Sequence, residues 1–104
     1  MPLHTLRAKP VEVAAIQYTG DNTHEINRAL LGPRYGQKPG LRPFPGSQAY
    51  PRTYQRDDVT AELWNAADAQ WQPVGAGDWI IRGLDGSLYA APAAVVAEKY
   101  DVIT

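Results

Sequence analysis

The residues of this chain best suited to chemistry gather in one stretch, residues 32–56, which reads GPRYGQKPGLRPFPGSQAYPRTYQR. This basic segment has a net charge of +5 and contains no acid, whereas the rest of the chain has a net charge of −6. Arginines interleaved with aromatic rings suit contact with a phosphate together with stacking on a base or ring. The segment is therefore the candidate binding site. Its candidate residues are Arg34, Tyr35, Lys38, Arg42, Phe44, Tyr50, Arg52, Tyr54 and Arg56.

The basic segment has two possible arrangements. It either docks onto the acidic body as a structural clamp, or it reaches away and exposes cations and aromatic rings to a partner. Surface ion pairs contribute only about 0–1 kcal/mol each. We therefore expect replacement of Arg42, Arg52 and Arg56 by Gln to change stability little in either arrangement. The same replacement should weaken binding of an anionic partner and flatten its salt dependence.

The inventory of catalytic residue types is sparse. A triad hydrolase needs a nucleophile, a base and a group that orients the base. The chain has two serines, two histidines and no G-x-S-x-G motif. A zinc site is disfavoured too, because the two histidines are far apart and cysteine is absent. The sequence thus predicts a protein that is not an enzyme and has no metal or cofactor.

Aspartates leave one weaker enzymatic alternative. Asp57 and Asp58 could bind a hard cation, but they more simply begin a strand as solvated charges. Asp78 follows Gly77, where it is expected to tie the turn through its side chain. A nucleotide-processing enzyme that uses these three residues is therefore the least favoured interpretation.

Composition limits the class of protein. The 104 residues suffice for a single domain, 1–104, from which the basic segment emerges as a loop excursion. The absence of cysteine fits a reducing compartment. The first ten residues lack a signal-peptide core, and no stretch is apolar for the roughly 20 residues that a membrane span needs. We expect a soluble cytoplasmic protein without membrane contact, and the oligomeric state remains open.

The elements before the basic segment can be placed from pattern. Residues 11–18 alternate with period two and predict a strand covered on both faces. Asn22 and Glu25 form a capping-box pattern for a helix over residues 22–31, with Ile26 and Leu30 facing inward. Pro and Gly throughout residues 32–56 argue against a helix or a central strand there.

The elements after the basic segment are mainly hairpins. Trp79 and Ile81 should face one side of a central strand and Ile80 the other, with a turn over residues 83–86. Pro73 confines its strand to an edge or to the strand's end. The pattern predicts an α+β fold, a small antiparallel or mixed sheet with one or two short helices packed on it; the alternative is a small β-barrel with a helix. The predicted strands are 59–64, 70–74, 79–82, 87–90 and 100–103, with a helix over 92–98.

Two stretches at the ends of the chain have a distinctive pattern: KPVEVAAIQYTGDN at residues 9–22 and GDWIIRGLDGSLYAAPAAVVAEKY at residues 77–100. They resemble a widespread group of small bacteriophage and prophage proteins, which open K-P-V-x-V-x-A-x-Q-[YW]-T-G-[DE]-N and close P-G-D-[WY]-I-[IV]-x-G-x-x-G-E-x-Y-P-x-x-P-D-x-F-x-x-x-Y. Ser87 stands where the group has Glu, and Ala90 where it has Pro. The resemblance implies a phage origin and no particular chemistry.

Together these observations predict a phage-encoded accessory protein that binds an anionic partner through the basic segment without catalysis. The partner would be a host or phage protein surface, or a small anionic molecule such as a nucleotide, and the location would be the host cytoplasm. The alternative is a structural virion protein whose 32–56 arm is ordered by neighbouring subunits.

Overall fold

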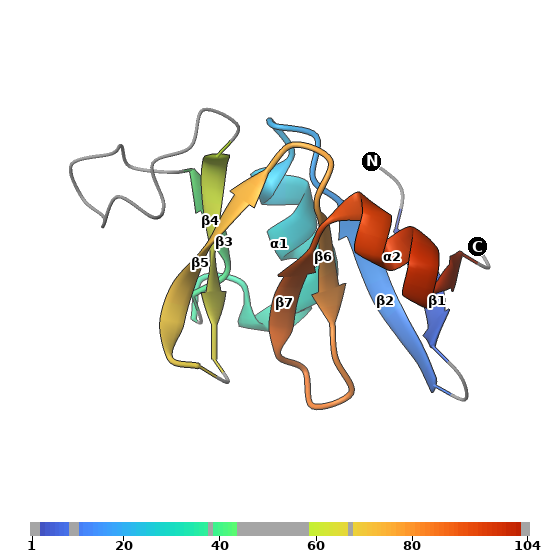
Figure 1. Ribbon diagram of the computed structural model, residues 1–104. Coiled ribbons are helices and arrows are strands. Elements are labelled where there is room, and N and C mark those ends of the chain that lie inside the picture. The colour runs from blue at the N-terminus through green and yellow to red at the C-terminus, as the bar shows by residue number, and fades with distance from the viewer. Residues whose placement is uncertain (1–2, 9–10, 38, 44–58, 67, 103–104) are drawn as a thin grey trace.

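The fold consists of two antiparallel sheets and two short helices (Figure 1). The computed structural model describes residues 3–8, 11–37, 39–43, 59–66 and 68–102. Neither sheet closes into a barrel within these ranges, so the predicted α+β class is confirmed and the barrel alternative is not observed. No helix in the described ranges is long and apolar enough to cross a membrane.

The larger sheet has five strands in the order β7-β6-β2-β1-β8. Its middle strand, β2, is apolar on both faces because it separates two hydrophobic cores, with Ile16 in one and Ala15 in the other. As predicted, Ile80 faces the first core, while Ile81 and Trp79 face the second. The strands are β1 (His4–Ala8), β2 (Val11–Gln17), β6 (Trp79–Arg82), β7 (Leu88–Ala91) and β8 (Asp101–Val102).

The smaller sheet has the order β3-β4-β5, made of β3 (Leu41–Pro43), β4 (Val59–Asn65) and β5 (Gln70–Gly75). Pro43 and Pro73 lie on its two outer strands, where a missing N–H does not interrupt the ladder. The edge position of Pro73 confirms the sequence prediction.

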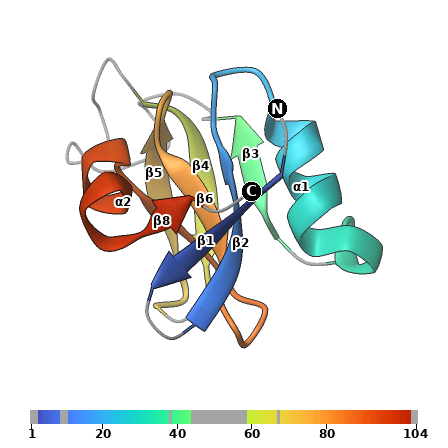
Figure 2. The same cartoon turned by 90° about the vertical axis from the view of Figure 1, so that its right-hand side faces the viewer.

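The two helices lie on opposite sides of the strands (Figure 2). Helix α1 (Thr23–Leu31) buries Ile26 and Leu30 in the first core, as its pattern predicts. Helix α2 (Ala93–Lys99) begins at Ala93, one residue later than predicted, and buries Val96 in the second core.

The predicted cap of α1 is wrong. Asn22 occupies the cap position, but its side chain makes no capping hydrogen bond. It instead accepts from the Thr19 N–H and donates to the Gln17 carbonyl, at 2.9 and 3.0 Å. These two bonds close the turn between β2 and α1, so the Asn22 amide serves the turn and not the helix terminus.

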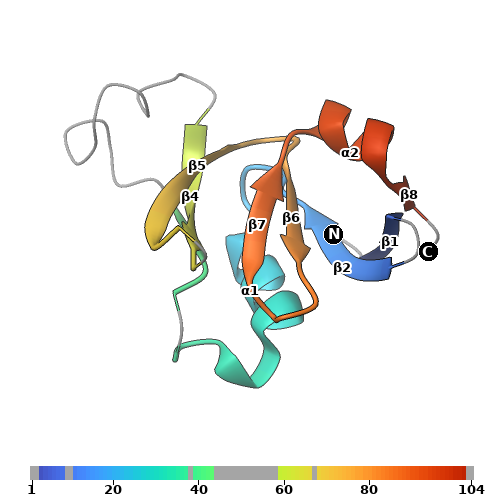
Figure 3. The ribbon, with the colours of Figure 1, turned by 60° about the horizontal axis from the view of Figure 1, so that its bottom comes forward.

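Three short elements were missed by the sequence prediction. Strand β1 buries Leu6 completely and pairs with β2 on one side and β8 on the other. A 3₁₀ turn, η1 (Gly32–Arg34), and the edge strand β3 lie inside the basic segment, although periodicity indicated neither. Figure 3 shows η1, which follows α1, at the same end of the molecule as the turn between β6 and β7.

Candidate functional site

A groove lies between α1 and β3, along the described part of the basic segment, and extends to Trp71 on β5. Its volume is about 620 Å³. Its described lining comes from α1, from residues 35–43 and from Trp71, and includes Arg42 and His24 but no Asp or Glu. The groove is thus a concave surface with basic side chains and no carboxylate among the described residues that line it.

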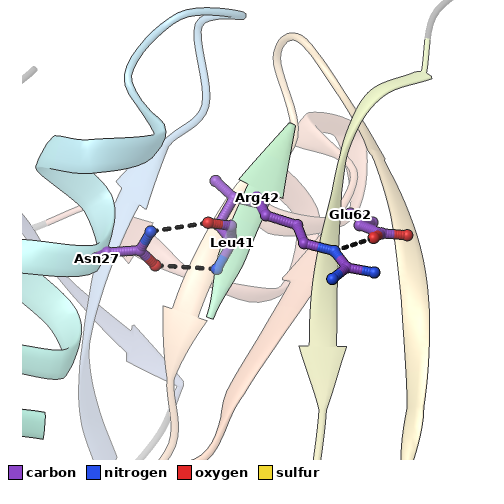
Figure 4. A network of polar contacts seen from close by, with 4 residues as sticks. All are labelled: Asn27, Leu41, Arg42 and Glu62. Atoms are coloured by element: carbon purple, nitrogen blue, oxygen red, sulfur yellow. Dashed lines mark hydrogen bonds and ion pairs between the residues drawn. The ribbon is translucent and has the colours of Figure 1, made fainter. Parts of the chain in front are cut away.

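The wall of the groove at β3 is held by an amide clamp from the helix (Figure 4). The Asn27 side chain donates from Nδ2 to the Leu41 carbonyl at 2.7 Å and accepts the Leu41 N–H on Oδ1 at 2.9 Å. The buried amide therefore takes the place of a neighbouring strand along the outer edge of β3. A Cβ on Gly40 would lie 2.4 Å from Asn27 Oδ1, so this close approach requires glycine.

Arg42 crosses the smaller sheet from β3 to β5. Its Nε donates to Oε1 of Glu62, its direct neighbour on β4 (Figure 4), and its Cζ lies 3.8 Å from the centre of the Trp71 ring. The Arg42 side chain is 50% exposed, whereas the Glu62 side chain is 1% exposed. The arginine therefore lies over the glutamate, and the pair is not a surface ion pair.

Glu62 places a buried carboxylate in this cluster. Its Oε1 accepts from Arg42, but its Oε2 is buried without a hydrogen-bond partner among the described residues. A buried carboxylate is tolerated only when a cation and hydrogen bonds compensate its lost hydration. Glu62 and the Trp71 ring together contact the Arg42 guanidinium at the groove. Trp64 supports Trp71 edge-on, with ring centres 5.4 Å apart.

The other end of the groove is formed by His24 and Tyr35. His24 Nδ1 and the Tyr35 hydroxyl are 2.8 Å apart, and the two rings lie 5.4 Å apart. His24 belongs to the first turn of α1, and Tyr35 directly follows η1, so the contact fastens the start of the basic segment to the helix. Tyr35 stays 39% exposed and presents an aromatic surface to the groove.

The structure describes three of the nine predicted binding residues. Tyr35 and Arg42 line the groove, and Arg34 lines a separate hollow that adjoins it. The charge of Arg42 is met by a carboxylate of the body, as the clamp alternative expects of the arginines, whereas Tyr35 is 39% exposed and not buried as that alternative expects. Outside the described residues lie Lys38, Phe44, Tyr50, Arg52, Tyr54 and Arg56.

The sequence reasoning missed Asn27 and Glu62. Asn27 lies one turn before Leu30 and Leu31, and this spacing was the available signal that its amide faces inward. Glu62 had no such signal, because alternation along β4 puts it on the face opposite the buried Ala61 and Leu63.

The other candidate chemical groups have structural partners. Asp78 Oδ2 accepts the Gly75 N–H at 3.1 Å and so ties its turn as predicted. Ser87 donates its hydroxyl to Asp85 at 3.1 Å. Within the described ranges, no group of three or more His, Asp and Glu residues is arranged to hold a metal ion. Asp57 and Asp58 lie outside those ranges.

Comparisons of the chain with protein-family models, with curated proteins and with solved structures found no match. The resemblance to phage proteins stays a prediction from the sequence.

Proposed function

We propose that this protein binds a small anionic molecule with a planar ring, of the size of a mononucleotide, in the groove between α1 and β3, and does not transform it chemically. One observation carries the proposal: Arg42 and His24 line the groove, and none of its described lining residues is an acid. The volume of about 620 Å³ lies in the range of about 300–1,000 Å³ that is typical of ligand pockets.

Arg42 supports recognition of the anion by its orientation. Its guanidinium is held by Glu62 on one side and by the Trp71 ring, so little side-chain entropy remains to be lost when a phosphate binds. Glu62 compensates much of the positive charge, so Arg42 would act through directed hydrogen bonds more than through net charge. This differs from the expectation drawn from the charge count alone.

The ring of the ligand would pack at the opposite end. Tyr35 is partly exposed there and is fastened by His24. Stacking of a base on an aromatic side chain contributes about 1–3 kcal/mol. A ligand that bears both an anion and a ring would therefore use both ends of the groove.

Titration of the protein with AMP, GMP, CMP and UMP, followed by the NMR signals of the Trp71 indole N–H and of the backbone amides of residues 35–37, tests the proposal. We expect saturable shifts at these positions, and weaker binding of the matching nucleosides, which lack the phosphate. Shifts that are equal for nucleotide and nucleoside, or absent for every nucleotide, would refute the proposal. The virion-arm alternative predicts the second of these outcomes.

Two variants test the assigned roles. Arg42→Lys keeps the charge beside Glu62 but loses the planar donor group and its stacking, so affinity for the nucleotide should fall about tenfold. Tyr35→Ala should reduce the affinity for nucleotides more than the affinity for inorganic phosphate. Arg28→Gln is the matched control, because Arg28 is an exposed cation on α1 outside the groove.

On the sequence resemblance, we propose that this binding is an accessory function of a phage in the host cytoplasm.

A further inference from the structure

A second hollow lies beside η1, where the start of the basic segment meets the turn between β6 and β7. Its volume is about 270 Å³. Apolar side chains form one part of its lining, chiefly Leu31, Trp64 and Leu88. Arg34 and Ser87 lie at its polar rim. The hollow thus combines an apolar interior with a cation at the edge.

The Arg34 guanidinium lies against Gly86. A Cβ on Gly86 would lie 2.9 Å from Arg34 Nη2 and 3.3 Å from Nη1, so a larger residue there would displace the end of this side chain. Gly86 has a φ of +85°, which the turn itself also requires. No hydrogen bond or ion pair joins the Arg34 guanidinium to another described residue. Its donors are therefore uncommitted within the described part of the chain.

One acid shares the rim. Asp85 accepts the Ser87 N–H on Oδ1 at 3.0 Å and the Ser87 hydroxyl on Oδ2 at 3.1 Å, and these bonds lower its pKa. The carboxylate is thus engaged within its own turn, but its charge remains at the rim. A second anion nearby penalises a doubly charged phosphate more than a singly charged carboxylate. The rim therefore favours a monoanion.

We propose that this hollow binds a small organic acid, with the ligand carboxylate on Arg34 and an apolar body against Trp64, Leu31 and Leu88. Guanidinium and carboxylate match each other with two parallel hydrogen bonds. This site differs from the nucleotide groove in its cation, its aromatic ring and its preferred anion, although the two adjoining hollows share Leu31 and Pro39 in their linings.

The test compares 3-phenylpropionate with its neutral isostere 3-phenylpropanamide, titrated into the full chain and followed by NMR. We expect the acid to shift the Trp64 indole N–H and the Gly86 and Ser87 amides, and to bind at least about tenfold more tightly than the amide. Equal affinities, or shifts at the Trp71 indole in place of Trp64, would overturn the proposal.

Two arginine variants complete the test. Arg34→Gln should reduce the affinity for the acid to that of the amide, whereas the matched control Arg28→Gln should leave it unchanged. An acid that binds Arg34→Gln as tightly as the parent would rule the site out. If Arg34→Gln failed to fold, the comparison of acid with amide on the parent protein would still decide the question.

Discussion

Arg42 and Arg34 belong to the same basic segment, yet the structure places them in opposite surroundings. Arg42 is half exposed, bonded to the buried Glu62 and stacked on Trp71. Arg34 is exposed and rests against Gly86 without a hydrogen bond or ion pair to another described residue. The effect of removing either arginine on stability therefore depends on whether a neighbouring buried group loses its hydrogen-bond or ion-pair partner.

The physical difference is desolvation. Without Arg42, the Glu62 carboxylate would stay in a site largely shielded from water with no cation beside it, which is strongly unfavourable. Without Arg34, no buried group among the described residues loses a partner. Arg42 therefore combines a structural function with its proposed role in binding, whereas Arg34 is free to serve a ligand alone.

The largest expected effect tests the Arg42 side of the comparison. Arg42→Gln should destabilise the fold by about 3–4 kcal/mol, toward the lower end for broken buried pairs because the arginine is half exposed. Urea denaturation measures this change. The double variant Arg42→Leu/Glu62→Leu should recover most of the loss, because no charge is then stranded. A loss below about 1 kcal/mol for Arg42→Gln would show that the pair behaves as a surface ion pair.

The second largest loss of stability is expected when the Asn27 amide clamp on β3 is removed. Asn27→Ala leaves the Leu41 N–H and carbonyl without their partners and should destabilise the fold by about 2–3 kcal/mol. Hydrogen exchange of the Leu41 amide should accelerate in this variant. Gln72→Ala is the matched control, since Gln72 clamps Ala90 on β7 in the same way with longer bonds of 3.3 Å. If Gln72→Ala lowered the free energy of unfolding as much as Asn27→Ala or more, the stronger stabilising role assigned to the Asn27 amide would be wrong.

A smaller change in stability is expected for a substitution at Gly86, the residue against which the Arg34 guanidinium lies. Gly86→Ala forces a non-glycine residue into a positive φ and should destabilise the fold by about 1–2 kcal/mol. The new methyl group also displaces the end of the Arg34 side chain, which is flexible and moves at little expense. Thermal unfolding measures the first consequence, and the titration with 3-phenylpropionate measures the second. Unchanged affinity for the acid would show that Gly86 does not position Arg34.

Removal of the Arg34 cation should hardly affect stability. Arg34→Gln is expected to stay within about 0.5 kcal/mol of the parent, as exposed substitutions usually do. Urea denaturation beside Arg42→Gln gives the sharpest form of the comparison, because both variants remove one arginine from the same segment. A loss above about 1 kcal/mol would mean that Arg34 supports the fold through contacts of its own.

The smallest effect concerns pH at the rim of the second hollow. The pKa of Asp85 is lowered in the folded chain, first by the Ser87 N–H and then by the Ser87 hydroxyl. The folded state thus binds fewer protons than the unfolded state near the ordinary pKa, so this contribution to stability is present above that value and is lost as pH falls through the folded pKa. Ser87→Ala removes the hydroxyl, so the decline of stability as pH falls below the ordinary pKa of an aspartate should become shallower.

Some features of this protein follow from the sequence because they depend on neighbours along the chain. Ile26 and Leu30 face inward because helical periodicity places them on one face, and Ile80 and Ile81 face opposite sides because strand residues alternate. Asp78 ties its turn with its own side chain. The position of Pro73 at a sheet edge follows from its missing N–H.

Other features were decided only by the tertiary structure. The Asn22 side chain bonds the turn between β2 and α1 and not the helix end. Strand β3 pairs with β4 on one side and is bonded by Asn27 at Leu41 on the other. The sequence also counts Arg34 and Arg42 alike, since each adds one positive charge to an acid-free segment. Their difference arises from Glu62, which is distant along the chain but is paired with Arg42 across β3 and β4 in the folded protein. Burial and desolvation depend on which segments contact one another in the folded protein. The local pattern of residue types along the chain does not predict such contacts.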